Sequence, residues 1–163
     1  MKVFGVVGYK NTGKTGLMER LVADITARGF SVSTIKHAHH SFDVDHAGKD
    51  SYRHRTAGAS QVLLSSGTRW ALMSELRGTQ EPPLKTLLAQ LDPVDLILIE
   101  GYKTDHHRKI ETYRKMTKGT LLAPTDPTII GVAADCAVSV IQPVFDLDDT
   151  TKIADFILAQ VGL

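Results

Sequence analysis

A phosphate-binding loop is the strongest chemical signal in the sequence. Residues 8–15 read Gly-Tyr-Lys-Asn-Thr-Gly-Lys-Thr and match the pattern G-x-x-x-x-G-K-[ST] in full. In that pattern the glycines let backbone N–H groups point into one concavity, the lysine reaches the β- and γ-phosphates, and the hydroxyl binds Mg²⁺. The sequence therefore predicts a nucleoside triphosphate site. The predicted nucleotide-binding residues are Gly8, Asn11, Thr12, Gly13, Lys14, Thr15 and Gly16, and Lys14 is also predicted to act in catalysis.

A second segment supplies an acid for the predicted metal site. Residues 96–99 are four apolar residues, and Glu100 and Gly101 follow them directly. An acid at the carboxyl end of a buried strand holds Mg²⁺ beside a phosphate loop, although aspartate is the commoner residue there. We therefore expect Thr15 and Glu100 to bind Mg²⁺ together.

Residues 36–46 are rich in histidine and aspartate and directly follow a predicted strand. Ligands of an open α/β sheet bind at the carboxyl ends of its strands, so this stretch is expected to face the phosphates. Asp43 or Asp45 would then orient the attacking water or a Mg²⁺-bound water. The histidines, His39 and His40 among them, are open to three interpretations: contacts to phosphate, contacts to a second ligand, or a transition-metal site.

Residues 48–58 carry several further bases and one acid. One interpretation is a solvated helix with one buried side. The other is a second anion-binding surface, in which Lys49, Arg53 and the start of the helix bind phosphate. The residues alone leave both open.

Composition limits the possible partners and the compartment. The chain has 163 residues, of which 42% are hydrophobic and 23% charged, which predicts one globular domain over residues 1–163. A net charge of +1 removes the bulk electrostatic case for nucleic acid or an anionic membrane as a partner. No apolar run approaches the roughly 18 residues of a membrane span. Cys136 is the single cysteine and fits a reducing, cytoplasmic setting.

The elements that must position these residues alternate between strands and helices. A strand over 3–7, a helix over 13–28 and a strand over 31–36 form a βαβ unit with parallel pairing. Residues 61–65 and 69–75 flank a Ser-Gly-Thr turn and predict an antiparallel hairpin. The predicted class is α/β, a three-layer P-loop nucleoside triphosphatase fold with a mostly parallel sheet and this inserted hairpin. The other expected elements are short helices over 49–57 and 84–91, strands over 94–99, 110–114, 128–133 and 144–147, and a final helix after a cap at 149–151.

Taken together, these segments resemble the molybdopterin-guanine dinucleotide biosynthesis adaptor protein B (MobB) family. The resemblance is carried by residues 6–15, 35–45, 48–58 and 98–103, in the family's order. The phosphate loop is common to many functions. The His/Asp stretch followed by Gly-Lys-Asp-Ser-x-Arg, with Glu-Gly-Tyr-Lys later in the chain, is much more specific.

The resemblance implies a GTP-binding protein with weak Mg²⁺-dependent GTPase activity that acts mainly as an accessory protein. It would assist the guanylyltransferase that attaches GMP to molybdopterin, so its partners would be GTP, that enzyme, and molybdopterin or its guanine dinucleotide form. It also implies a homodimer, for which the hairpin is the natural arm. Carried over by position, Gly13, Lys14 and Thr15 bind phosphate and Mg²⁺, Glu100 completes the metal site, Asp43 and Asp45 fall in a switch-like loop, and His37, Lys49 and Arg53 are candidates for the second ligand or partner surface.

Other interpretations remain open at this point. Guanine specificity rests on the resemblance alone, because the sequence has no N-K-x-D motif, and residues 125–127 are the proposed base-side loop. A small P-loop kinase needs a basic lid over the γ-phosphate, for which residues 106–109 with Arg114 and Lys115 are candidates. A GTP-driven metallochaperone would use the His-rich loop.

Overall fold

The computed structural model describes residues 1–38, 42–117 and 119–163. The histidines His39 and His40, which the sequence offers for metal or phosphate contacts, lie outside the described residues. The chain forms two compact units, one of residues 1–38 with 92–163 and the other of residues 39–91. A single domain over the whole chain therefore stays a prediction. No helix of the described residues has the length and apolar character needed to cross a membrane.

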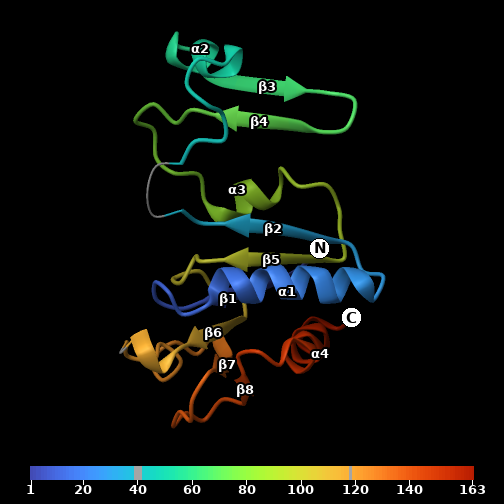
Figure 1. Ribbon diagram of the computed structural model, residues 1–163, viewed down its shortest axis with the longest axis vertical. Coiled ribbons are helices and arrows are strands. Elements are labelled where there is room, and N and C mark those ends of the chain that lie inside the picture. The colour runs from blue at the N-terminus through green and yellow to red at the C-terminus, as the bar shows by residue number, and fades with distance from the viewer. Residues whose placement is uncertain (39–41, 118) are drawn as a thin grey trace. The chain divides into compact units, whose positions relative to one another are not determined.

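A wholly parallel sheet is the frame of the first unit (Figure 1). Its strand order is β2–β5–β1–β6–β7–β8, and every neighbouring pair is parallel. All carboxyl ends therefore meet at one edge, which confirms the predicted α/β fold with a mostly parallel sheet. The strands are β1 (Lys2–Val7), β2 (Val32–Lys36), β5 (Leu96–Glu100), β6 (Lys109–Tyr113), β7 (Ile129–Ala134) and β8 (Val144–Asp146).

Two helices form the main core against one face of this sheet. Helix α1 (Lys14–Ala27) presents the fully buried Leu17, Leu21 and Ile25 at helical spacing, and α4 (Thr150–Val161) packs beside it. Both helices share one apolar cluster with the sheet. Because strand side chains alternate between faces, Val7 joins a second, smaller cluster on the opposite face. After β6 the chain forms a short 3₁₀ helix at Lys115–Thr117, and Leu121, Leu122 and Ala123 beyond it pack into this second cluster.

Strand β6 is central although its sequence is polar. Lys109, Glu111 and Thr112 are each 0% exposed. Each has a hydrogen-bond partner: the Lys109 ammonium donates to Thr128 Oγ1 at 2.5 Å, the Glu111 carboxylate accepts the Ala123 N–H at 2.8 Å, and the Thr112 hydroxyl lies 2.7 Å from that of Thr12. Buried polar groups are tolerated only when they are paired in this way.

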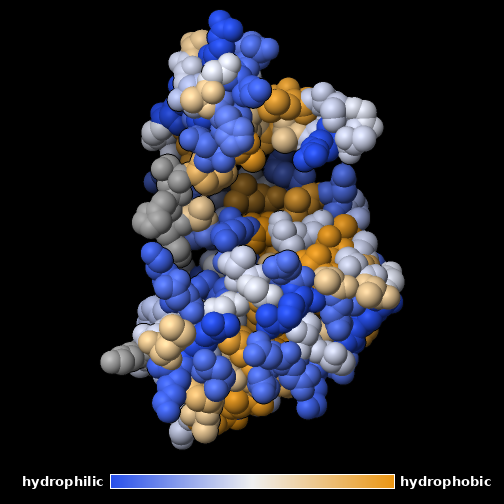
Figure 2. Space-filling view, in the orientation of Figure 1, coloured by the Kyte–Doolittle hydropathy of each residue, from blue (hydrophilic) through white to orange (hydrophobic). Residues whose placement is uncertain are grey.

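The second unit is built around a two-stranded antiparallel hairpin, as predicted. Its strands pair in the register Ser65↔Trp70 and form a sheet separate from the parallel one. Most of its side chains are exposed, including Leu63 at 61% and Trp70 at 62%. Figure 2 shows apolar side chains on the surface of this unit. The elements are α2 (Asp50–Thr56), β3 (Gln61–Ser65), β4 (Trp70–Ser74) and α3 (Leu84–Leu88).

Candidate nucleotide site

The loop between β1 and α1 has the backbone shape that the phosphate-loop pattern predicts. Three of its residues have positive φ angles: Gly8 at 147°, Asn11 at 65° and Gly13 at 94°. A methyl group on Gly8 would lie 2.6 Å from the backbone oxygen of Thr112 and 2.6 Å from the hydroxyl oxygen of Thr12. Glycine is therefore required at position 8 both for its φ angle and for the close approach of β6.

Thr12 fastens the loop to the sheet. Its hydroxyl is buried, donates to the Tyr9 carbonyl at 2.8 Å and lies 2.7 Å from the hydroxyl of Thr112 on β6. The Thr112 hydroxyl also reaches the Val7 carbonyl at 3.2 Å. Among the predicted nucleotide-binding residues, Thr12 thus uses its side chain to shape the loop.

The start of α1 leaves backbone donors available for an anion. Gly13 is the N-cap and offers no side chain to the N–H groups of the first turn, which includes Lys14, Thr15 and Gly16. These groups and the helix dipole together suit the binding of a phosphate group. The Lys14 ammonium donates to the Tyr9 carbonyl at 2.6 Å, so it is folded over the loop.

The electrostatics around Lys14 also favour an anionic ligand. Burial lowers the pKa of Lys14, the carboxylate of Glu100 opposes that shift, and the charges of Lys103 and Lys36 add to it. Three ammonium groups therefore gather around one carboxylate. A bound phosphate chain would offset their mutual repulsion.

Glu100 ends β5 beside β1, as the sequence predicts. It pairs in register with Val6, and its Oε1 lies 3.2 Å from Thr15 Oγ1 and 3.3 Å from Lys36 Nζ. The structure thus brings the two predicted metal ligands into contact. Their oxygen chemistry fits Mg²⁺, which commonly takes one or two protein ligands and completes its shell with phosphate and water. Within the described residues no group of three or more His, Cys, Asp or Glu side chains suits a metal. A Mg²⁺ site beside a phosphate loop does not require such a group, because phosphate and water supply the other ligands.

Two lysines of the site escaped the sequence reasoning. Lys36 ends β2, which neighbours β5 on the side away from β1. It pairs in register with Glu100, and its ammonium contacts that carboxylate. The Lys103 ammonium lies 4.6 Å from the centre of the Tyr9 ring, a cation–π contact to the phosphate loop. The sequence did carry a signal for both, since Lys36 ends a predicted strand and Lys103 comes three residues after the end of another. It did not show which strands are neighbours in the sheet.

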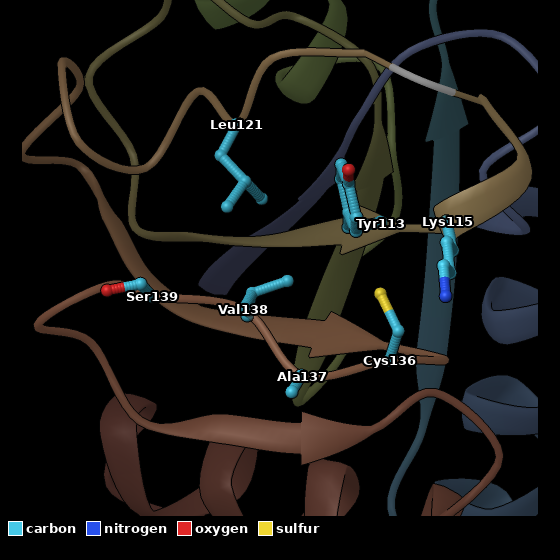
Figure 3. Close-up of a pocket in the computed structure, with 7 residues that line it drawn as sticks. All are labelled: Tyr113, Lys115, Leu121, Cys136, Ala137, Val138 and Ser139. Atoms are coloured by element: carbon cyan, nitrogen blue, oxygen red, sulfur yellow. The ribbon is translucent and has the colours of Figure 1, made fainter.

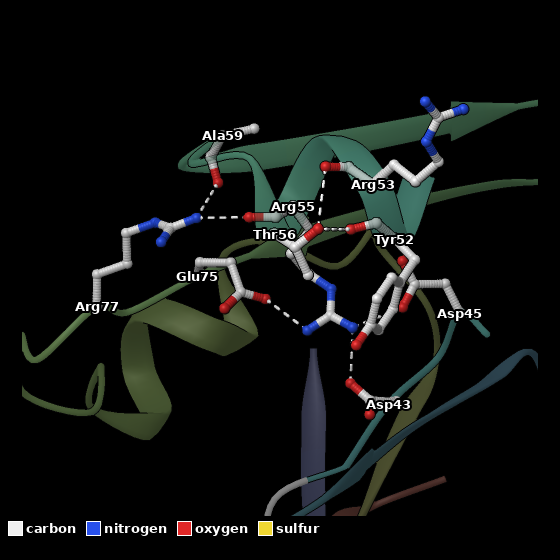
Figure 4. A network of polar contacts seen from close by, with 9 residues as sticks. All are labelled: Asp43, Asp45, Tyr52, Arg53, Arg55, Thr56, Ala59, Glu75 and Arg77. Carbon is white, nitrogen blue, oxygen red and sulfur yellow. Dashed lines mark hydrogen bonds and ion pairs between the residues drawn. The ribbon is translucent and has the colours of Figure 1, made fainter. Parts of the chain in front are cut away.

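Of the remaining predicted residues, His37 lies in the first unit, where its ring stacks on that of Tyr102 with the centroids 4.6 Å apart. The others, Asp43, Asp45, Lys49 and Arg53, belong to the second unit. There Arg55 gathers the acids of the switch-like loop: its Nη2 lies 2.8 Å from both Asp43 Oδ1 and Asp45 Oδ1, and its Nη1 lies 3.4 Å from Glu75 (Figure 4). The two aspartates raise the pKa of Arg55, the hydrogen bond to Asp45 most of all, and burial opposes that shift. Asp43 and Asp45 are thus held by a side chain that the sequence reasoning missed. Their role in catalysis stays a prediction.

The two bases predicted for a second anion surface are exposed in the same unit. Lys49 is the N-cap of α2 and, with Trp70, lines a cavity of about 630 Å³. The Arg53 guanidinium pairs with Asp50 at 3.7 Å. Phosphate binding by Lys49 and Arg53 also stays a prediction.

Two sequence predictions are wrong. Residues 106–109, offered with Arg114 and Lys115 as a kinase lid, and residues 125–127, offered as a base-side loop, lie at the amino ends of β6 and β7, whereas the phosphate loop follows the carboxyl end of β1. Of the predicted lid, only Arg114 and Lys115 follow the carboxyl end of β6. The side chains at the amino ends are also engaged there, since Lys109 is fully buried 3.7 Å from Asp126, and Arg108 donates to the last turn of α4. The sequence misled because it does not show that β6 and β7 run parallel to β1, and that direction puts the segments before them at the opposite edge of the sheet.

A cavity of about 440 Å³ opens at the carboxyl ends of β6 and β7 (Figure 3). Tyr113, Leu121 and Val138 give it apolar walls, and Cys136 and Lys115 also line it. Side chains alternate along the chain here, so Tyr113 and Lys115 face this cavity while the residue between them faces the phosphate loop.

Comparison with known proteins gives a consistent family. The family model described as "Molybdopterin guanine dinucleotide synthesis protein B" matches residues 3–135. The chain is 40% identical over 159 residues to the molybdopterin-guanine dinucleotide biosynthesis adapter protein of Haemophilus influenzae, covering 95% of this chain and 86% of that protein. It is 38% identical over 156 residues to the Escherichia coli adapter protein, covering 92% and 87%. The crystal structure of a MobB protein homolog from Bacillus stearothermophilus is similar with a TM-score of 0.73 and 28% identity, covering 99% of both chains.

Proposed function

Because the chain belongs to the molybdopterin guanine dinucleotide synthesis protein B family, we propose that it binds Mg–GTP at the phosphate loop and acts as an adapter in molybdopterin-guanine dinucleotide biosynthesis. The names of its relatives support the pathway. The contact between Thr15 and Glu100 beside the uncapped start of α1 carries the nucleotide proposal. Its pathway partners would be the enzyme that attaches GMP and its pterin substrate.

Each residue of the loop has a defined task in this proposal. The backbone N–H groups of residues 13–16 bind the β-phosphate, and Lys14 leaves the Tyr9 carbonyl to reach the β- and γ-phosphates. Thr15 and Glu100 would hold Mg²⁺, and the Lys36 ammonium would remain paired with the Glu100 carboxylate. When bound, Mg²⁺ neutralises part of the charge of the β- and γ-phosphates.

Hydrolysis by such a site should be slow. Asp43 and Asp45 are the candidates for orienting water, and both carboxylates are occupied by Arg55. A carboxylate whose oxygen already accepts a hydrogen bond from a guanidinium is less available to orient a water molecule. We therefore expect slow but measurable formation of phosphate from GTP, in keeping with an adapter that uses GTP mainly as a bound ligand.

A nucleotide-binding titration tests the proposal. GTP should bind in the presence of Mg²⁺ more tightly than ATP does, and Lys14→Ala should abolish binding. Lys10→Ala is the matched control, because Lys10 is an exposed lysine of the same loop. Unchanged GTP affinity in Lys14→Ala would sink the phosphate-loop assignment, and rapid transfer of phosphate to a metabolite would favour a kinase instead.

We also propose that the chain forms a homodimer through the β3–β4 hairpin. A two-stranded sheet is marginally stable alone, and this one exposes Leu63, Leu64, Trp70 and Leu72 by 41–62%. The register places Leu63, Trp70 and Leu72 on one face of the hairpin, and an exposed apolar face of this kind marks an interaction site. A second copy of the chain would bury it.

Sedimentation of charged variants tests the dimer. Leu63→Glu with Trp70→Glu should give monomers, because each would place a charge in the apolar contact. Ile141→Glu is the control, since Ile141 is 99% exposed in the first unit. A hairpin variant that stays dimeric, or a monomeric wild type, would refute this interface.

A further inference from the structure

Arg114 follows β6 directly and lies against the phosphate loop. A methyl group placed on Gly13 would come within 3.1 Å of Arg114 Nε and 3.3 Å of its Nη2. It would also come within 3.2 Å of Leu147 Cδ2, from the segment between β8 and α4. The guanidinium therefore lies beside the loop one residue before Lys14.

The backbone of Arg114 is held by hydrogen bonds, but its guanidinium has a donor without an acceptor among the described residues. Its carbonyl accepts the Thr117 N–H at 3.0 Å and the Thr117 hydroxyl at 2.6 Å. Its Nε is buried and has no hydrogen-bond partner among the described residues. Arg20 on α1 offers a contrast, because its Nη2 donates to the Leu147 carbonyl at 2.7 Å and its Nε to the Thr150 hydroxyl at 2.9 Å.

A buried donor on a permanently charged group is costly unless an acceptor meets it. An arginine beside the N-terminus of a helix adds a second positive end to the same place. Both costs disappear if an anion occupies the space in front of Gly13. Phosphate is the anion that the loop itself is shaped for.

The strand order indicates which part of a nucleotide Arg114 meets. Glu100 ends β5 on one side of β1, and Arg114 follows β6 on the other side. Mg²⁺ and the γ-phosphate lie toward the acid in a P-loop site. The phosphate chain then runs toward β6, so the α-phosphate end lies nearest the guanidinium.

We propose that Arg114 is a nucleotide-binding residue that donates to the α-phosphate and so holds nucleoside di- and triphosphates alike. The inference rests on the proposed function of the loop. A phosphate oxygen would be the acceptor for the unpartnered Arg114 Nε. The end of β6 would then both hold the phosphate loop, through the Thr12–Thr112 contact, and bind the nucleotide. Arginine suits this position because its planar fork can bind two phosphate oxygens at once.

Titration of GTP and GDP into Arg114→Met tests the inference. Both affinities should fall by about tenfold to a hundredfold, and by a similar factor, because both ligands carry the α-phosphate. Lys115→Met is the matched control: it removes a neighbouring exposed charge and should leave both affinities unchanged. A loss confined to GTP would place Arg114 at the γ-phosphate and overturn the proposal, as would unchanged affinity for both nucleotides.

The stability of the nucleotide-free protein separates binding from a structural role. Urea unfolding of Arg114→Met should show no loss of stability, since the change removes a buried donor without a partner among the described residues. A large loss would make Arg114 a structural residue and overturn the proposal. Arg114→Lys keeps the charge and should bind both nucleotides more weakly than the wild type, which covers the case of a misfolded methionine variant. If the wild type bound no nucleotide, the proposed function would fail. If the wild type bound nucleotide and the Arg114 variants bound it with the same affinity, this inference alone would fail.

Discussion

Gly8→Ala should damage the phosphate loop more than any other single methyl group. Two costs add at this position. An alanine at a positive φ costs about 1 kcal/mol, and the new methyl would lie 2.6 Å from the backbone oxygen and the hydroxyl oxygen of Thr112. Thr112 belongs to β6, which pairs with β1 on one side and β7 on the other, so its backbone oxygen cannot move aside freely. Overpacking of this kind costs about 1–3 kcal/mol, which gives a total of about 2–4 kcal/mol.

Gly29→Ala is the matched control for this prediction. Gly29 lies in the same unit and has a positive φ of 93°, but a methyl group there would meet nothing within 4 Å. It should therefore lose only about 1 kcal/mol and keep its nucleotide affinity. Urea unfolding of both variants measures the difference, and titration with GTP measures the loop. A Gly8→Ala protein that is no less stable than Gly29→Ala, or that binds GTP like the wild type, would refute the reasoning.

Three further predictions concern charged side chains. Glu100→Gln should lower GTP affinity on the order of tenfold or more in Mg²⁺ but leave binding in a chelator nearly unchanged, as measured by calorimetry; equal losses in both buffers would exclude a metal role. Burial raises the pKa of Glu111 above its usual 4.5, so the folded chain holds that proton more tightly than the unfolded chain. Wild-type stability should therefore fall as the pH rises from about 4.5 through the raised pKa, by about 1.4 kcal/mol for each unit of that rise, whereas Glu111→Gln should lack this component in urea unfolding; parallel pH curves would contradict it. Arg55→Met should speed proteolytic cleavage between residues 42 and 50, because three carboxylates lose their common partner, whereas Arg53→Met should cleave at the wild-type rate.

Much of the site was predictable because its chemistry is local in the chain. The glycines, lysine and threonine of residues 8–15 lie between an apolar strand and an amphipathic helix, and that order alone specifies a phosphate loop. Glu100 was predictable for a similar reason, since an acid after four buried residues must emerge at the end of a strand. The parallel βαβ unit and the antiparallel hairpin followed from the same local patterns.

What the sequence could not supply was the neighbours of each strand. Strand β6 is half polar in sequence, yet it lies inside the sheet, because Lys109, Glu111 and Thr112 have hydrogen-bond partners from other segments. The misplaced lid and base-side loop have the same cause, since the polarity of a loop does not reveal the edge of the sheet at which it lies.

The sequence by itself predicted a phosphate-binding loop before the first helix, because the backbone shape of eight consecutive residues depends mainly on those residues. The tertiary structure alone decided which charges surround that loop. Lys36 and Lys103 reach it because β2 and β5 lie on one side of β1, and Arg114 reaches it because β6 lies on the other. Asp43 and Asp45 are instead gathered by Arg55. Strand order is set by the burial of whole faces and by pairings between distant residues, and no local spacing records it.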